Sequence, residues 1–276
     1  MATIHQFRHH AMATFFDLRI FHEDATYAGQ AAQGAFDRVD DLEARLSRFR
    51  PQSEIQRIAR LLPGQSLRLS EDTFDCLTLA RKMERATRQA FSPTPAALQY
   101  KSTMPEWSLS PVELSICCER GLVEFDLGAI GKGFALDRMA DLLRQWDCFS
   151  FLLIVGGSSI VAGDAPAGLD GWSCGLGDED APQRLLLTNA SLSGSGITVK
   201  GNHILNPLTG RSALRQSRTW ALCDTAAESD ALSTAAMVLP ELELTEVLAM
   251  EPTWLVLVED DGRIRTIGNR SVTLER

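Results

Sequence analysis

Three short stretches of the sequence combine residue types that bind phosphate or a metal ion. The first, residues 123–137, reads Val-Glu-Phe-Asp-Leu-Gly-Ala-Ile-Gly-Lys-Gly-Phe-Ala-Leu-Asp. A predicted strand delivers Asp126, and the three glycines that follow let the backbone turn tightly and approach a ligand before a helix begins. Helix N-termini favour anions, and Lys132 stands where it could meet a phosphate. The GxxGxG spacing is neither the dinucleotide-binding GxGxxG pattern nor a P-loop, so the stretch alone also fits an ordinary turn.

The second stretch, residues 229–234, reads Ser-Asp-Ala-Leu-Ser-Thr. In a helix, Asp230 and Thr234 lie on the same face because they are four residues apart. A carboxylate and a hydroxyl, completed by backbone carbonyls, waters and substrate phosphates, form the kind of site that holds Mg²⁺. The same spacing also fits an acidic residue that stabilises the helix dipole, with Thr234 bonding back to the preceding turn. Spacing alone favours this second interpretation.

The third stretch joins Leu-Ser-Gly-Ser-Gly at 192–196 to His-Ile-Leu-Asn-Pro-Leu-Thr-Gly at 203–210. His203 directly precedes a turn that contains proline, and its neutral imidazole is suited to take a proton from a hydroxyl nucleophile. Taken alone, a histidine near a turn is more often a solvent-exposed residue than a base. His5, His9 and His10 lie in a terminus that we expect to be flexible, so we do not assign them a metal.

The elements that must position these residues follow from hydrophobic periodicity. Alternation predicts a strand over residues 14–21, and apolar residues at three- and four-residue spacing predict a helix over 24–47. Ser53 and Ser70 are predicted helix N-caps. Residues 91–110 show no period and predict a loop, followed by strands at 112–117 and 122–127 joined by a turn. Further helices are expected at 133–145, 229–239 and 241–250, and further strands at 149–155, 254–258 and 264–267.

Irregular alternation of strands and helices, with frequent hairpins, predicts an α+β fold rather than a doubly wound sheet. The 276 residues are 45% hydrophobic and 23% charged, which is typical of a soluble globular protein with a proper core. The formal charge of −9 disfavours nucleic acid and anionic membrane as partners. The six scattered cysteines favour reduced, buried thiols, and with no export signal in sight we expect a cytoplasmic protein.

Together and in this order, the stretches resemble the FAD:protein FMN transferases, the ApbE-type flavin transferases. The resemblance covers residues 10 to 239, most of the chain. Its remaining matching pieces are His-Ala-Met-Ala-Thr at 10–14, Leu-Ser-Arg-Phe-Arg at 46–50, Ser-Glu-Ile at 53–55, and Val-Gly-Gly at 155–157 with Gly163. The resemblance implies duplicated α+β halves related to the T-fold with mostly antiparallel sheets, forming two intimately packed lobes of a single domain over residues 1–276.

The resemblance also implies a function and a set of site residues. FAD would be the donor, Mg²⁺ would sit at its pyrophosphate, and FMN would pass to a Ser or Thr hydroxyl of a target flavoprotein with release of AMP. The metal would be held by the carbonyl of Ala129 and the side chains of Asp230 and Thr234. FAD would be contacted by Asp126, Lys132, Ser233 and, at the flavin, Met12, and His203 would be the catalytic base.

The chain departs from the family pattern at several positions. Ala13 and Gln89 stand where glycine is usual, Ser92 stands where aspartate is usual, and the segment from 97 to 126 is shorter than usual. There are two other hypotheses, and the shortened segment motivates the second of them. One is an FAD pyrophosphatase, in which water replaces the acceptor hydroxyl, and the other is a flavin-binding relative without turnover.

Overall fold

The largest element of the fold is an eight-stranded antiparallel sheet. The structure is a computed structural model that describes residues 2–95, 105–176, 183–196, 206–207, 213, 218–260, 263–270, 272 and 274–275. Along the sheet the strands run in the order β1 (Thr3–Ala11), β2 (Thr14–His22), β6 (Phe151–Val155), β7 (Ser159–Ala162), β10 (Ala190–Gly196), β11 (Arg218–Cys223), β12 (Leu255–Asp260), β13 (Arg263–Gly268).

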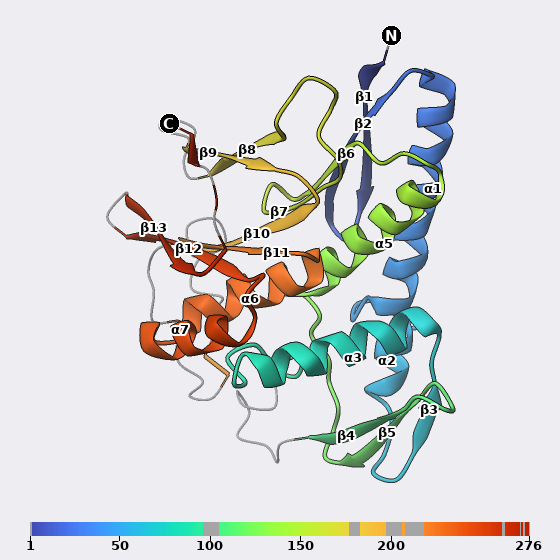
Figure 1. The fold of residues 1–276 in the computed structure, drawn as a ribbon. Helices are drawn as coiled ribbons and strands as arrows, with labels where there is room; N and C mark the ends of the chain where they lie inside the picture. The colour runs from blue at the N-terminus through green and yellow to red at the C-terminus, as the bar shows by residue number, and fades with distance from the viewer. Residues whose placement is uncertain are drawn as a thin grey trace.

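Three long helices form a layer against one face of this sheet (Figure 1). They are α1 (Ala25–Leu46), α5 (Gly131–Gln145) and α6 (Ala226–Val238). The apolar side of α1 is buried, as its three- and four-residue spacing requires. By contrast, every residue of α6 is buried except Glu228 and Thr234, because this helix packs on β10, β11 and α5. Three of its five polar residues, Ser229, Asp230 and Ser233, therefore lie inside the protein.

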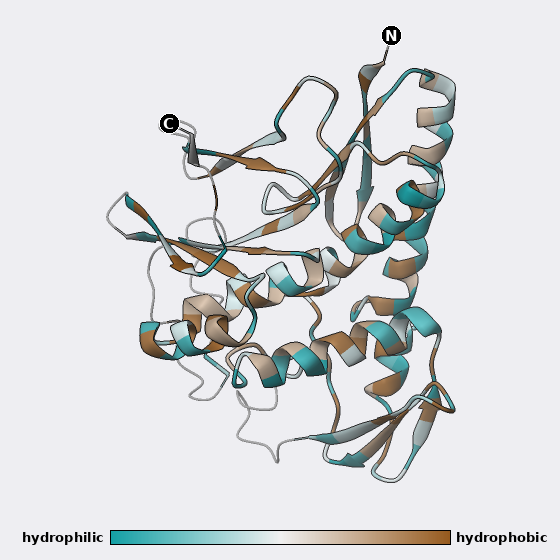
Figure 2. Ribbon diagram, in the orientation of Figure 1, coloured by the Kyte–Doolittle hydropathy of each residue, from teal (hydrophilic) through white to brown (hydrophobic). Residues whose placement is uncertain are grey.

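The opposite face of the sheet carries a second, smaller core. Alternate residues of one strand point to opposite faces, and Leu153 and Val155 join the main core while Leu152 joins the second. A three-stranded sheet supplies much of this second core and has the order β14 (Leu274–Glu275), β9 (Gln183–Leu187), β8 (Trp172–Leu176). Figure 2 shows hydrophobic residues recurring along both helices and strands, with hydrophilic residues between them.

A third layer follows α1 in the chain. It contains α2 (Glu54–Ile58), α3 (Glu71–Ala86) and a small sheet of order β3 (Ser66–Arg68), β5 (Ser115–Arg120), β4 (Glu106–Ser110), and it lies at the bottom of Figure 1. The short helix α7 (Glu241–Met250) follows α6 and contacts β13. Among the described residues, no helix combines the length and the apolar character that crossing a bilayer demands.

Most sequence-based expectations for the elements are confirmed. The fold is α+β with antiparallel sheets, as predicted. Ser53 and Ser70 are N-caps whose hydroxyls accept from the backbone N–H groups of Gln56 and Thr73. The predicted flexibility of the first residues is wrong, because β1 pairs with β2 along its whole length. His9 in this strand contacts Asp40 of α1, with Nε2 and Oδ1 2.8 Å apart.

The predicted hairpin at 112–127 is also wrong. The true hairpin pairs β4 with β5 one segment earlier, and the turn between them contains Leu114 with a φ of 48°. Residues 122–127, all within the described part of the chain, form no strand. Alternate residues Val123, Phe125 and Leu127 are buried in the main core, so their alternation reflects burial rather than pairing. The segment is instead hydrogen-bonded to the loop after α3, where the N–H of Asp126 donates to the carbonyl of Pro93.

Candidate functional site

A cavity of about 1310 Å³ opens where the helical layer, the large sheet and the loop after α3 meet. It gathers residues that are far apart in the sequence. Seven of the eight predicted site residues line it: Met12, Asp126, Ala129, Lys132, Asp230, Ser233 and Thr234. The eighth, His203, lies outside the described residues. The structure therefore brings the first two sequence stretches together with the Ser-Gly part of the third, since Gly194, Ser195 and Gly196 also line the cavity.

The turn between β1 and β2 forms one wall of the cavity. Met12 and Ala13 both adopt positive φ, at 50° and 58°, which is the backbone that a two-residue hairpin turn requires. This turn carries Met12 to the cavity, and Thr14 at the start of β2 also lines it. An apolar side chain at this wall suits the face of an aromatic ligand.

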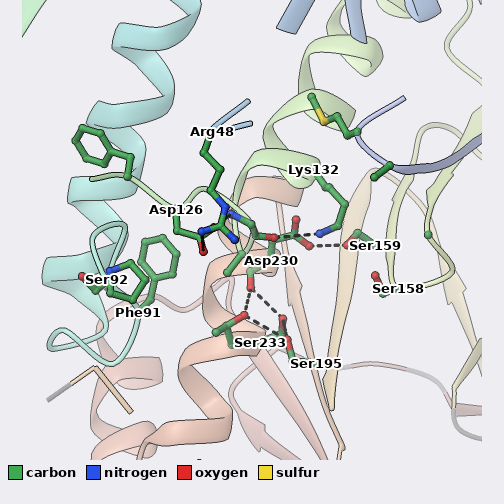
Figure 3. A pocket seen from close by; sticks show the side chains of 18 of the residues that line it. Arg48, Phe91, Ser92, Asp126, Lys132, Ser158, Ser159, Ser195, Asp230 and Ser233 are labelled. Atoms are coloured by element: carbon green, nitrogen blue, oxygen red, sulfur yellow. Dashed lines mark hydrogen bonds and ion pairs between the residues drawn. The ribbon is translucent and has the colours of Figure 1, made fainter. Parts of the chain in front are cut away.

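The backbone of residues 126–132 forms the second wall. Asp126 Oδ1 accepts a hydrogen bond from the Gly128 N–H at 2.9 Å, and its Oδ2 lies 3.2 Å from Arg48 Nη1 in an ion pair. Lys132 Nζ donates to the Gly128 carbonyl at 3.0 Å. The cations Arg48 and Lys132 thus lie on either side of the turn, as Figure 3 shows, and both line the cavity.

Asp230 lies at the base of the cavity on α6. Its Oδ2 accepts from the Gly133 N–H at 2.7 Å, and its Oδ1 accepts from the Ser159 hydroxyl at 2.5 Å (Figure 3). Asp230 is only 6% exposed, and within the described part of the chain no Lys or Arg forms an ion pair with it. Two neutral donors solvate this buried carboxylate without neutralising it. A cation bound at this carboxylate would offset the cost of burying its charge.

Hydroxyl groups surround the same part of α6. The Ser195 hydroxyl is 2.9 Å from that of Ser233 and 3.3 Å from that of Thr234. Thr234 also donates to the Asp230 backbone carbonyl at 3.2 Å, so the back-bonding that the spacing suggested is present. The Thr234 oxygen can then accept from Ser195 and still has a second lone pair for a cation. The helix-dipole alternative for Asp230 needs amending, because its carboxylate binds an N–H in the first turn of α5 rather than in its own helix.

The donor set around Asp230 fits an oxygen-binding cation such as Mg²⁺. Ala129 offers a backbone carbonyl and Thr234 a hydroxyl on the same cavity as the carboxylate. Within the described residues, no group of three or more His, Cys, Asp or Glu side chains could hold a metal ion. Magnesium needs no such group, since it is commonly held by one or two carboxylates together with substrate phosphates and waters.

The loop after α3 closes another side of the cavity with Phe91, Ser92 and Pro95. Ser92 donates to Glu84 Oε1 at 2.9 Å, and burial raises the pKa of the Glu84 carboxyl. Gln89 enters this loop with a φ of 64°. Serine at position 92, where aspartate is usual in the family, therefore ties the loop back to α3 rather than adding a charge to the cavity.

Three residues of the site received no role from the sequence. Arg48 and Ser195 lie within stretches that carried the family resemblance, so the sequence could have identified them as site residues. Ser159 carried no signal, because nothing near it in the sequence indicates that its hydroxyl meets a carboxylate 71 residues away.

Comparison with known proteins identifies a family for the chain. Residues 12–258 match the model of the ApbE family. FAD:protein FMN transferase from Escherichia coli (strain K12) is 26% identical over 151 residues, which are 50% of this chain and 43% of that protein. The protein of the same name from Chlamydia muridarum is 26% identical over 205 residues, 63% of each chain. The matched regions thus span less than two thirds of these relatives.

The fold has close counterparts among solved structures. The flavin transferase ApbE from Vibrio cholerae superposes with a TM-score of 0.80 at 17% identity, over 96% of this chain and 97% of that one. Such a likeness at low identity establishes the shared fold. Because the family model covers most of the residues, including both walls and the base of the cavity, the chain belongs to the ApbE family.

Proposed function

We propose that this protein transfers FMN from FAD to a Ser or Thr hydroxyl of a target flavoprotein, with Mg²⁺ and with release of AMP. The observation that carries the proposal is the buried Asp230 carboxylate, which faces a large cavity and has no cationic side chain as partner in the described part of the chain. The names of the matched relatives support the choice of FAD and FMN.

The proposed cation would be held by the Asp230 carboxylate, the Thr234 hydroxyl and the Ala129 carbonyl. When bound, Mg²⁺ offsets the charge of the two phosphates and the charge that develops on the departing AMP. This matters because the protein itself carries a formal charge of −9. Two like unit charges ~4 Å apart repel by about 4 kcal/mol at an effective dielectric constant near 20.

The protein's own groups would bind and orient FAD. Lys132 can turn from the Gly128 carbonyl to a phosphate, and Asp126 would contact the FAD with one oxygen already fixed by Gly128. Ser233 would lie against the same ligand, and Met12 would wall the flavin. Their shared cavity and the family resemblance support these roles.

The reaction forms a bond between the acceptor oxygen and the FMN phosphorus and breaks the bond from that phosphorus to the bridging oxygen. AMP leaves with the bridging oxygen. The proton of the acceptor hydroxyl passes to a base, and we propose His203 for this role on the sequence alone.

The direct test mixes the protein with FAD, Mg²⁺ and candidate flavoproteins and follows the acceptor mass and AMP together. We expect covalent FMN and AMP in equal amounts, loss of both with a chelator, and loss of both in Asp230→Asn. The matched control is Asp224→Asn, since Asp224 lies just before α6 and pairs with Arg270 on the surface. Unchanged transfer by Asp230→Asn would rule the proposed site out.

Two other outcomes have distinct signatures. Release of FMN and AMP at full rate without an acceptor would identify an FAD pyrophosphatase. Binding of FAD without any product would identify a flavin-binding relative without turnover.

We also propose that the protein acts in the cytoplasm as a single domain, without nucleic-acid or membrane partners. Five of the six free cysteines, all except Cys117, are buried, where they pack as small apolar residues and suit a reducing compartment. Fractionation of cells that express a tagged protein would check the compartment.

A further inference from the structure

Asp137, the last residue of the stretch at 123–137, binds the start of a helix that lies far away in the sequence. Its Oδ1 accepts from the Ala226 N–H at 2.7 Å, and its Oδ2 accepts from the Ala227 N–H at 2.9 Å. These are two of the N–H groups that the first turn of a helix leaves without a partner. The hydroxyl of the N-cap Thr225 accepts from the Glu228 N–H at a longer 3.4 Å. The start of α6 is thus held mainly by a side chain of α5.

A second contact between the same helices lies one turn away. Gly133 precedes Asp137 by four residues on α5, and Ala226 precedes Asp230 by four on α6, so each pair shares one helix face. The Gly133 N–H binds the Asp230 carboxylate at 2.7 Å. The two helices are therefore joined twice, with Asp137 at one contact and Asp230 at the other.

The backbones at this crossing are unusually close. A Cβ atom at Gly133 would lie 2.2 Å from the Ala226 carbonyl oxygen, which leaves no room for any side chain. Hydrogen bonds from Ala226 and Ala227 to Asp137 hold the same turn of α6 in this close approach. A small displacement of the first turn of α6 would move Asp230 away from Gly133 and Ser159 together.

We propose that Asp137 is a positioning residue for the cation site. It holds the first turn of α6 against α5, so that the Asp230 carboxylate, one turn further along, is aimed into the cavity. This inference rests on the proposed function only in taking Asp230 as a cation ligand. Residues that orient a metal ligand typically change metal affinity by about 10- to 100-fold when they are removed.

The test uses Asp137→Asn, which keeps the size of the side chain and one acceptor oxygen. The full-length protein without FAD is titrated with Mn²⁺, and free Mn²⁺ is read by electron paramagnetic resonance. We expect the Kd for Mn²⁺ to rise about tenfold. Hydrogen–deuterium exchange at Ala226 and Ala227 should accelerate in the same variant, and this readout requires neither metal nor catalysis.

Asp141→Asn is the matched control. Asp141 follows Asp137 by one turn on α5, and its replacement removes the same charge, but it pairs with Arg138 and Arg144 on the surface. We expect wild-type Mn²⁺ affinity and wild-type exchange in this variant. Asp137→Glu, which keeps the charge but moves the carboxylate by one methylene, is the second variant and should also weaken Mn²⁺ binding.

The outcomes separate the two proposals. A wild-type protein that binds no Mn²⁺, either alone or with FAD added, would count against the cation site itself and hence against the proposed function. Wild-type binding that persists unchanged in Asp137→Asn and Asp137→Glu would overturn the positioning role alone. If Asp137→Asn shows no cooperative melting transition, Asp137→Glu decides, and unchanged Mn²⁺ affinity in that variant would overturn the role.

Discussion

The backbone of Gly133 on α5 meets the backbone of Ala226 on α6 with no space for a side chain between them. An added Cβ would lie 2.2 Å from the Ala226 carbonyl oxygen and 2.7 Å from the Ala227 nitrogen. Both neighbours are backbone atoms of the buried helix α6, so neither can rotate away as a flexible side chain would. The contact sets the distance between the glycine turn and the helix that carries Asp230.

We therefore expect Gly133→Ala to force α5 and α6 apart. Overpacking of this kind typically costs about 1–3 kcal/mol, and it should lower the free energy of unfolding by at least that amount. Chemical denaturation followed by circular dichroism measures the loss. Gly131→Ala is the control, because a Cβ there meets Leu127 Cβ at an ordinary 3.5 Å. Equal stability of the two variants would contradict the close contact.

Ser159→Ala should weaken the cation site without unfolding the protein. The substitution removes the 2.5 Å hydrogen bond to Asp230 Oδ1 and leaves the carboxylate with the Gly133 N–H. We expect metal affinity to fall about tenfold, as is usual when a group that orients a ligand is lost. Titration with Mn²⁺ reads this directly. The neighbour Ser158 also lines the cavity but makes no hydrogen bond to Asp230 in the described part of the chain, so Ser158→Ala should bind normally.

Two departures from the family pattern should lower stability. Ala13 and Gln89 stand where glycine is usual, and their φ angles are 58° and 64°. A residue with a Cβ is destabilised by roughly 1–2 kcal/mol in the left-handed region, and glycine avoids this strain. Glycine also raises the entropy of the unfolded chain, which cancels part of the gain in stability. We expect Ala13→Gly and Gln89→Gly each to raise Tm by about 1–3 °C. Ala59→Gly is the control of opposite sign, since Ala59 has a φ of −61°.

The pH dependence of stability should carry a contribution from Asp137. Burial raises the pKa of its carboxyl to about 7, against the two backbone hydrogen bonds that lower it and together with the nearby charges of Asp230 and Asp141 that raise it. Between about pH 4 and pH 7 the folded state thus binds more protons at this group than the unfolded state, whose Asp has a pKa of ~3.9. This contribution to stability falls as the pH rises through that window and is constant above it.

Melting curves of wild type and Asp137→Asn at several pH values check this. The Asn variant cannot titrate at position 137, so the Tm of wild type relative to the variant should fall from pH 5 to pH 7 and level off at pH 8. Two curves that stay parallel over the whole range would contradict the raised pKa.

The positions of the helices were predictable from the sequence because their signals are local. The apolar residues of α1 recur at helical spacing, and Ser53 and Ser70 bind N–H groups three residues away. The residue types around Asp126, Lys132 and Asp230 by themselves indicate phosphate and cation chemistry. The β4–β5 hairpin was missed because alternation at 122–127 reports burial and carries no information about a pairing partner.

The tertiary structure alone decided how these residues meet. Gly133 and Asp230 are 97 residues apart, and Ser159 and Asp230 are 71 apart, so no local pattern could reveal either hydrogen bond. The same holds for Asp137, whose partners lie 89 and 90 residues away. Residue type determines which atoms can donate or accept, whereas packing of α5 against α6 determines which of them come within reach. The sequence therefore determined the chemical groups of the site. Only the packing of α5 against α6 determined which of these groups lie close together.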